Sequence, residues 1–157
     1  MATALKKANA SSRFLLDLAA TSEKLGWHAL NLGRCFDHCV YDELIEQYDV
    51  HTRIVNSCNS YCTHAYLITK EGAKILQKYT WPMLTTEDHI RTSLSDAGKL
   101  RYLSVSPRLF RQNRDPDTSI HKEHEGECVP KWLPTFERGC RSQRVIFLDN
   151  GDPVVRM

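Results

Sequence analysis

Apolar side chains recur at helical spacing near the start of the chain and alternate with polar ones further along. The first pattern predicts an amphipathic helix over residues 11–25, capped by serine and stopped by Gly26. Strands are predicted over residues 27–32 and 50–55, where apolar residues cluster or alternate. Residues 41–49 carry a mixed pattern that fits either a helix or a strand.

The centre of the chain shows the clearest succession of strand and helix patterns. A strand over residues 63–68 leads to Thr69, whose side chain is a good N-cap for the helix behind it. That helix has one apolar face and ends before Pro82. Thr86 is predicted to cap a second helix, which has acids in its first turn and stops at Gly98. Alternating strands and helices are typical of an α/β domain.

The last third combines a strand, a polar loop and a hairpin pattern. Residues 100–105 predict a strand, and residues 111–127 are polar without periodicity, as in a loop. Apolar runs at 144–148 and 153–155 flank an Asn-Gly turn within 149–152, a strong local signal for a β-hairpin. We therefore expect an α/β fold with a mixed sheet and a C-terminal β-hairpin.

The composition is that of an ordinary folded domain. The 157 residues are 41% hydrophobic and 25% charged, which argues against disorder, a collagen-like repeat or a coiled coil. The formal net charge of +2 gives no electrostatic reason to expect a nucleic-acid partner. No apolar run approaches the roughly 18 residues of a membrane span, and the polar start lacks a signal-peptide core. We expect a cytoplasmic protein without a membrane span.

Two Cys-x-x-x-Cys pairs lie in the first half of the chain, Cys35 with Cys39 and Cys58 with Cys62. Four sulfur ligands in two pairs could form a tetrahedral zinc site, although zinc pairs are more often spaced by two residues. Free cysteines are also often buried as small apolar side chains, which is the interpretation that we favour. Disulfides rank last because no secretory signal precedes the pairs.

Short motifs in a fixed order cover residues 27–120, about 94 of the 157 residues. Each motif alone is unspecific, whereas the ordered set is distinctive. The set consists of WHALNLG at 27–33, THAYLIT at 63–69, EGAKIL at 71–76, TTEDHI at 85–90, the strand from Tyr102 to Pro107, LFRQ at 109–112 and SI at 119–120. It resembles glycosyltransferase family 25, which includes collagen β-galactosyltransferases and bacterial lipooligosaccharide galactosyltransferases.

The resemblance implies a partial GT-A-like fold and the inverting transfer of galactose or glucose from a UDP-sugar to an acceptor hydroxyl. It also implies Mn²⁺, which neutralises the departing diphosphate. Residues 1–120 would form the acceptor-side part of the family's domain, and residues 121–157 an extension of it or an appendage. The family's donor-binding strand and Glu-Asp-Asp motif have no counterpart upstream of Trp27. We expect the donor half to be missing, and a partner chain could supply it.

An inverting transfer needs a carboxylate that takes the proton of the acceptor hydroxyl. The acidic element that opens the second central helix offers Asp88 and Glu87, and we favour Asp88. Acids in the first turn of a helix also complement the helix dipole without any catalytic role.

Candidate binding residues lie on the central strand and in the polar loop. His64 and Tyr66 share a strand face by alternation, so they could line the donor or acceptor cleft or simply belong to a half-buried strand. Asp115 and Asp117 match the short Asp-x-Asp pattern with which many transferases hold Mn²⁺. The resemblance places three further residues near the donor phosphates: Gln112, Arg114 and Ser119.

Two other functions stay open beside the transferase. A non-catalytic relative could keep the scaffold and act as a glycan-binding or partner subunit. A small zinc-binding module could instead be organised by the four paired cysteines. The sequence also leaves open whether the acceptor hydroxyl belongs to a glycan or to a protein.

Overall fold

The computed structural model describes residues 2–35, 37, 39–57, 60–83, 85–111, 145–147 and 153–155. The main body is a mixed five-stranded sheet in the order β2-β3-β5-β1-β4. Its strands are β1 (Ala29–Asn31), β2 (Glu43–Gln47), β3 (Arg53–Asn56), β4 (Tyr66–Ile68) and β5 (Tyr102–Ser106). The central pair β1 and β5 is parallel, and the other neighbours are antiparallel. The predicted α/β fold with a mixed sheet is thus confirmed.

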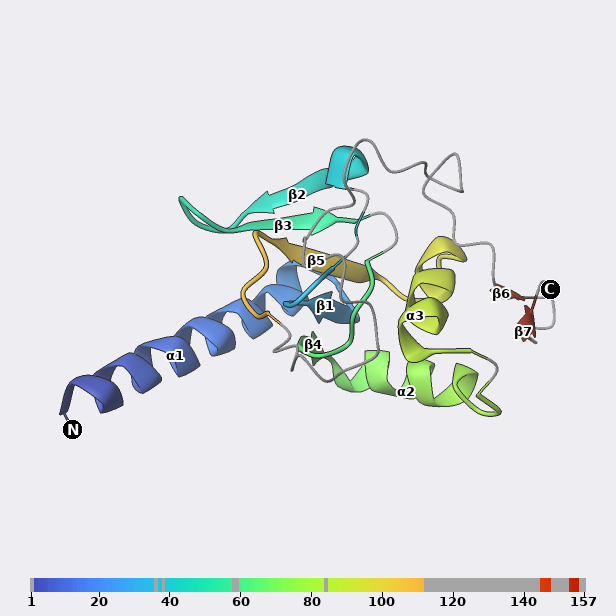
Figure 1. Cartoon of the computed structure of the whole chain (residues 1–157), viewed down its shortest axis with the longest axis horizontal. Helices are drawn as coiled ribbons and strands as arrows, with labels where there is room; N and C mark the ends of the chain where they lie inside the picture. The colour runs from blue at the N-terminus through green and yellow to red at the C-terminus, as the bar shows by residue number, and fades with distance from the viewer. Residues whose placement is uncertain are drawn as a thin grey trace, which may run out of the picture.

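In the described part of the chain, three α-helices accompany the sheet (Figure 1). They are α1 (Ala2–Leu25), α2 (Lys70–Tyr79) and α3 (Glu87–Asp96). Strand alternation divides the apolar side chains between two cores. Leu30 packs with Leu18 of α1, whereas its neighbour Ala29 packs with Leu76 of α2 and Leu94 of α3. The central strands are therefore covered by helices on both faces.

The first helix ends where predicted but begins earlier. The φ of +63° at Gly26 places this residue in the left-handed region, and its N–H donates to the Ser22 carbonyl. The predicted N-cap at Ser11 and Ser12 is wrong, because α1 already begins at Ala2. The alanine-rich segment before the serines has high helix propensity and continues the helix.

The second helix follows its predicted capping pattern. The hydroxyl of Thr69 accepts a hydrogen bond from the Gly72 N–H at 3.0 Å and donates one to the His28 carbonyl at 3.2 Å. Gly72 packs directly on this carbonyl, so the start of α2 is fastened to the start of β1.

The third helix has the predicted extent but lacks the predicted capping hydrogen bond. Thr86 occupies the N-cap position, yet its side chain makes no capping bond to the backbone and donates instead to the Asp88 carboxylate. After the helix, the φ of +67° at Gly98 reverses the chain toward β5, as predicted.

The ambiguous segment and the strand behind it form an antiparallel pair, β2 with β3. The predicted strand over 50–55 begins only at Arg53, because residues 49–52 form a turn. In that turn the Asp49 carboxylate accepts from the N–H groups of His51 and Thr52 at 2.7 and 2.8 Å. These bonds also lower the pKa of Asp49.

The C-terminal hairpin is confirmed. β6 (Val145–Phe147) and β7 (Pro153–Val155) pair in antiparallel fashion, with Val145 opposite Val155, and β6 lies beside α3. The loop over 111–127 and the domain division at residue 120 lie outside the described residues, apart from Arg111. No helix in the described part of the chain is long and apolar enough to cross a membrane.

The contact between α2 and β1 predicts that Gly72 tolerates no side chain. A Cβ at this position would overlap the His28 carbonyl oxygen, which is backbone and cannot rotate away. We expect Gly72→Ala to lower the free energy of unfolding by about 1–3 kcal/mol in denaturant titrations, although alanine is the better helix former. The control Ala73→Gly, at an exposed site of the same helix, should cost only about 1 kcal/mol. An unchanged or higher stability of Gly72→Ala would contradict this packing.

Candidate functional site

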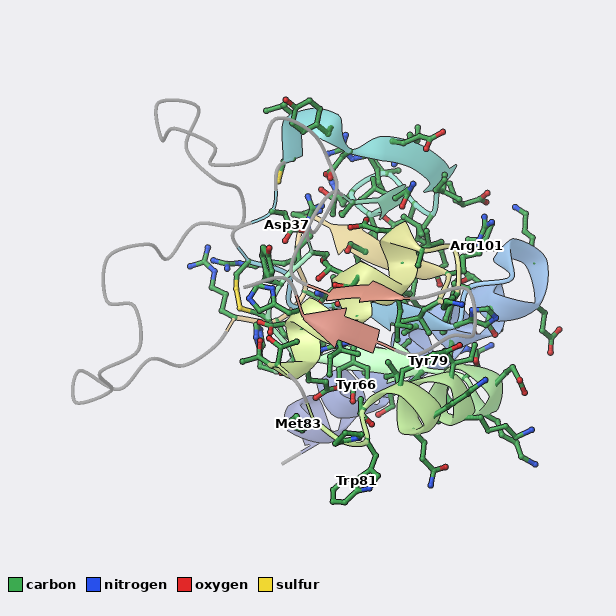
Figure 2. The ribbon with its side chains drawn as sticks, turned by 90° about the vertical axis from the view of Figure 1, so that its right-hand side faces the viewer. Asp37, Tyr66, Tyr79, Trp81, Met83 and Arg101 are labelled. Atoms are coloured by element: carbon green, nitrogen blue, oxygen red, sulfur yellow. A yellow bond between two sulfur atoms is a disulfide. The ribbon has the colours of Figure 1, made fainter. Side chains whose placement is uncertain are left out.

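The carboxyl ends of the parallel strands β1 and β5 meet at one edge of the sheet, which we call the carboxyl edge. Asn31 ends β1 there, and Tyr66, the first residue of β4, lies opposite it in the register. Tyr66 contacts Glu87 in the first turn of α3 and so brings this helix start to the same edge. In Figure 2, Asp37 beyond the end of β1 and Arg101 before β5 lie on opposite sides of the domain. Sites in open α/β sheets commonly lie at such carboxyl ends.

Tyr66, Glu87 and Arg91 form the centre of the candidate site. The Tyr66 hydroxyl donates to Glu87 Oε1 at 3.3 Å, and Arg91 Nε lies 3.7 Å from the same oxygen. Burial and the Glu87 carboxylate raise the pKa of Tyr66, while the Arg91 cation opposes this shift. The phenol therefore stays protonated and donates. The sequence named Tyr66 and Glu87 but not Arg91, because an arginine within a helix is usually a solvated charge.

Asp88, the favoured base in the sequence, is occupied by its own helix start. Its Oδ1 accepts from the His89 N–H at 3.0 Å and from the Thr86 hydroxyl. These are the local contacts expected of an acid in the first turn of a helix. Glu87, by contrast, is bound to another element of the fold, through the Tyr66 hydroxyl of β4.

His64 lies at the same edge but not on a strand. It occupies the bend before β4, so strand alternation does not set its direction. Its ring packs on Gly33, where a Cβ would overlap it, and its Nε2 lies 3.3 Å from the Phe110 carbonyl oxygen. The N–H groups of Leu109 and Phe110 donate to the Leu32 carbonyl. The exposed His64 ring thus sits where the chain leaves β5 and crosses the end of β1.

Behind the edge lies a buried polar layer that the sequence analysis missed. Asn31 Nδ2 donates to Ser60 Oγ at 3.0 Å, and Ser60 Oγ lies 2.8 Å from Ser104 Oγ of β5. A polar Asn31 within an apolar strand is the signal that could have revealed it.

Arg34 extends this layer with buried charges. Its guanidinium, 1% exposed, lies 2.8 Å from Asp42 Oδ2 and 3.4 Å from Asp37 Oδ2. It also donates to the hydroxyls of Ser57 and Ser106 at 2.6 and 3.2 Å. These contacts join the ends of β1, β3 and β5 and make the carboxyl edge rigid.

A disulfide between Cys35 and Cys62 ties the loop after β1 to the lead-in of β4. Cys39 is disulfide-bonded as well. The interpretation of these cysteines as free apolar side chains is therefore wrong, and so is the low rank given to disulfides. A zinc site on the four paired cysteines does not fit, since three of those sulfurs lack the thiolate that zinc needs. Cys58 lies outside the described residues.

The remaining predicted site residues, Gln112, Arg114, Asp115, Asp117 and Ser119, lie outside the described residues. Within the part of the chain that the structure describes, no three His, Cys, Asp or Glu side chains come together to hold a metal ion. The described residues thus give Mn²⁺ no fitting ligand set.

A cavity of about 540 Å³ lies away from these residues, between the β2–β3 pair and the C-terminal end of α3. It is lined by residues such as Glu43, Asn56, Ser95 and Arg101. Because it lies at the start of β5, it is separate from the carboxyl edge, and none of the described candidates His64, Tyr66, Glu87 and Asp88 lines it.

No protein-family model, curated protein or solved structure matches this chain. The likeness to glycosyltransferase family 25 therefore stays a prediction.

The disulfide predicts a loss of stability when both of its cysteines are replaced. Cys35 and Cys62 are 27 positions apart, and closing a loop of that length in the unfolded chain corresponds to about 3–4 kcal/mol. We expect Cys35→Ala/Cys62→Ala to lose about this much unfolding free energy in guanidinium titrations. The control is Ser11→Ala/Ser12→Ala, which replaces two exposed residues of α1 by alanine. A double variant as stable as the parent would contradict the structural role of this bond.

Asp37 predicts a specific pH dependence of stability. Burial raises its pKa well above the ordinary value and outweighs the opposing effect of Arg34. The folded chain then binds this proton more tightly than the unfolded chain. The contribution of Asp37 to the free energy of unfolding is therefore full below about pH 4 and is lost as the pH rises through the elevated pKa. In Asp37→Asn this decline should vanish, because the amide does not ionise in this pH range. The amide oxygen can still accept from the Tyr61 N–H, so the local structure is kept. Parallel stability curves of parent and variant from about pH 4 to about pH 8 would refute this.

Proposed function

We propose that the chain is an inverting glycosyltransferase domain with a GT-A-like fold. It would transfer galactose or glucose from a UDP-sugar to a hydroxyl group of a glycan or protein. The ordered motifs over residues 27–120 support this proposal. The observation that carries it is the Glu87 carboxylate, anchored through one oxygen by Tyr66 at the carboxyl edge of the sheet.

The geometry of Glu87 suits a general base. Its Oε1 is held by Tyr66 and lies near Arg91, while the side chain remains 38% exposed and open to a substrate. In the proposed step the acceptor oxygen bonds to the anomeric carbon as the bond from that carbon to UDP breaks. The hydroxyl proton passes to the Glu87 carboxylate, and the bonding electrons leave with UDP. A base on a helix start that is fastened to the sheet is well positioned for this transfer.

Glu87 thus replaces Asp88 as the proposed general base. Asp88 Oδ1 is engaged by its own helix start, whereas Glu87 is held from another strand. A carboxylate that must stay in place while substrates enter benefits from such a bond across the fold.

The disulfide bears on where the reaction takes place. Disulfides persist in secretory compartments and outside cells and are rare in the cytosol. The cytoplasmic location predicted from the sequence stays untested, and the Cys35–Cys62 bond argues against it. We propose that the domain works in an oxidising compartment, where glycans and secreted proteins are available as acceptors.

A non-catalytic glycan-binding role is the second candidate, and it is favoured by an exposed aromatic side chain. Trp81 is 85% exposed and its neighbour Met83 is 68% exposed, in the loop that leads to α3. Figure 2 shows Trp81 projecting away from the domain. An indole ring that is open to solvent can stack on a sugar ring. The transfer assay below separates this role from catalysis.

The proposal predicts that Glu87→Gln loses transfer while Asp88→Asn keeps it. Removing a general base should lower kcat by about 10²–10⁴-fold, because the acceptor proton then has no recipient. UDP release from UDP-galactose or UDP-glucose, with glycan and hydroxylysine-peptide acceptors, measures this effect. Circular dichroism of each variant checks the fold, since Glu87→Gln leaves Arg91 without its carboxylate. Equal activity of parent and Glu87→Gln, or a folded parent without any transfer, would contradict the proposal.

A further inference from the structure

Arg91 is a completely buried cation directly beneath the candidate base. Its side chain is 0% exposed although it lies only one helical turn from the start of α3. The guanidinium carbon lies 4.3 Å from the ring centre of Tyr66 and 5.2 Å from that of Tyr102. None of its three nitrogens makes a hydrogen bond within the part of the chain that the structure describes.

A buried guanidinium without hydrogen bonds is rare, because it has lost its water and gained no polar partner. Arg34 in the same domain shows the usual arrangement, with two carboxylates and two serine hydroxyls around its guanidinium. Arg91 has one acid within ion-pair distance among the described residues, Glu87 at 3.7 Å. The arrangement is therefore poorly explained by stability alone.

We propose that Arg91 is a positioning residue of the transfer reaction: held between Tyr66 and Tyr102, it keeps the Glu87 carboxylate where it receives the acceptor proton. This inference rests on the proposed function. Arg91 does not touch the substrate, since it is fully buried, and it acts through Glu87. Among the described residues, the charged and titratable groups around the Glu87 carboxylate include Tyr66 of β4, Arg91 of α3 and Asp88, which follows Glu87 in the sequence.

The chemistry of the guanidinium explains why the position holds arginine. Its planar, weakly hydrated group stacks on aromatic faces, and it remains charged when buried. The rings fix the guanidinium, and its charge attracts Glu87 Oε1 from below while the Tyr66 hydroxyl binds the same oxygen. Both contacts fall on Oε1, which leaves the second oxygen for the acceptor hydroxyl.

The first test is a thermal-unfolding cycle on the full chain, and it does not depend on activity. Arg91→Met keeps an unbranched apolar stem, although a shorter one, and removes the charge. If Arg91 and Glu87 are coupled, Glu87→Gln alone should lower Tm more than Arg91→Met/Glu87→Gln does, because the double variant buries no unpaired cation. Additive changes in Tm would overturn the coupling. The pKa of Tyr66, followed by NMR, should rise further in Arg91→Met, since the opposing cation is gone.

The second test separates positioning from mere structure. Arg91→Met should lower kcat at least about tenfold with KM unchanged, and Arg91→Lys should restore part of the loss because it keeps the charge. Lys78→Met, which removes a surface cation 5.2 Å from the Tyr79 ring centre, is the matched control and should leave kcat unchanged. If the folded Arg91→Met chain kept full kcat, the positioning role would be wrong even with transfer established. If the parent shows no transfer while the Tm cycle is non-additive, the proposed function fails and the coupling stands.

Discussion

The parallel pairing of β1 with β5 at the centre of the sheet is the constraint on which the other features depend. Ala29 pairs with Tyr102 and Asn31 with Ser104, so both strands end at the same edge. A parallel pair requires a crossover connection, and between β1 and β5 the chain runs through β2, β3, β4, α2 and α3. Because α3 leads back into the start of β5, its own first turn lies at the carboxyl edge. The location of Glu87 thus follows from the pairing in the centre of the sheet.

The same pairing explains why polar and charged groups are buried there. The strands β1 and β5 are short and end inside the domain. The polar backbone and side-chain groups at their ends are therefore buried and need hydrogen-bond partners. Asn31, Ser60 and Ser104 satisfy one another, and Arg34 gathers two carboxylates. The disulfide from Cys35 fastens this layer to the lead-in of β4. A rigid, cross-linked edge is a suitable base for a site that must hold a carboxylate in place.

Features determined by neighbouring residues could be predicted from the sequence, and those determined by distant contacts could not. The Thr69 cap, the end of α1 at Gly26 and the C-terminal hairpin follow from local chemistry. The strand over Glu43–Gln47 was undecidable, because its pairing with β3 rather than its own pattern makes it a strand. In the site, Tyr66 and Glu87 were predicted separately, but their contact and the burial of Arg91 arise only when β4 and α3 pack together. The cysteine pairing likewise depends on the fold bringing Cys35 and Cys62 together, not on their spacing.

The proposed activity of the carboxyl edge is an inverting hexose transfer. The most direct test is proton NMR of the products after the full chain is incubated with UDP-galactose and a hydroxyl-bearing glycan acceptor. The donor carries its sugar in the α configuration, so the account predicts a β-linked galactoside that accumulates in step with free UDP. A folded chain that yields no galactoside, or one that yields the α-linked product, would contradict it.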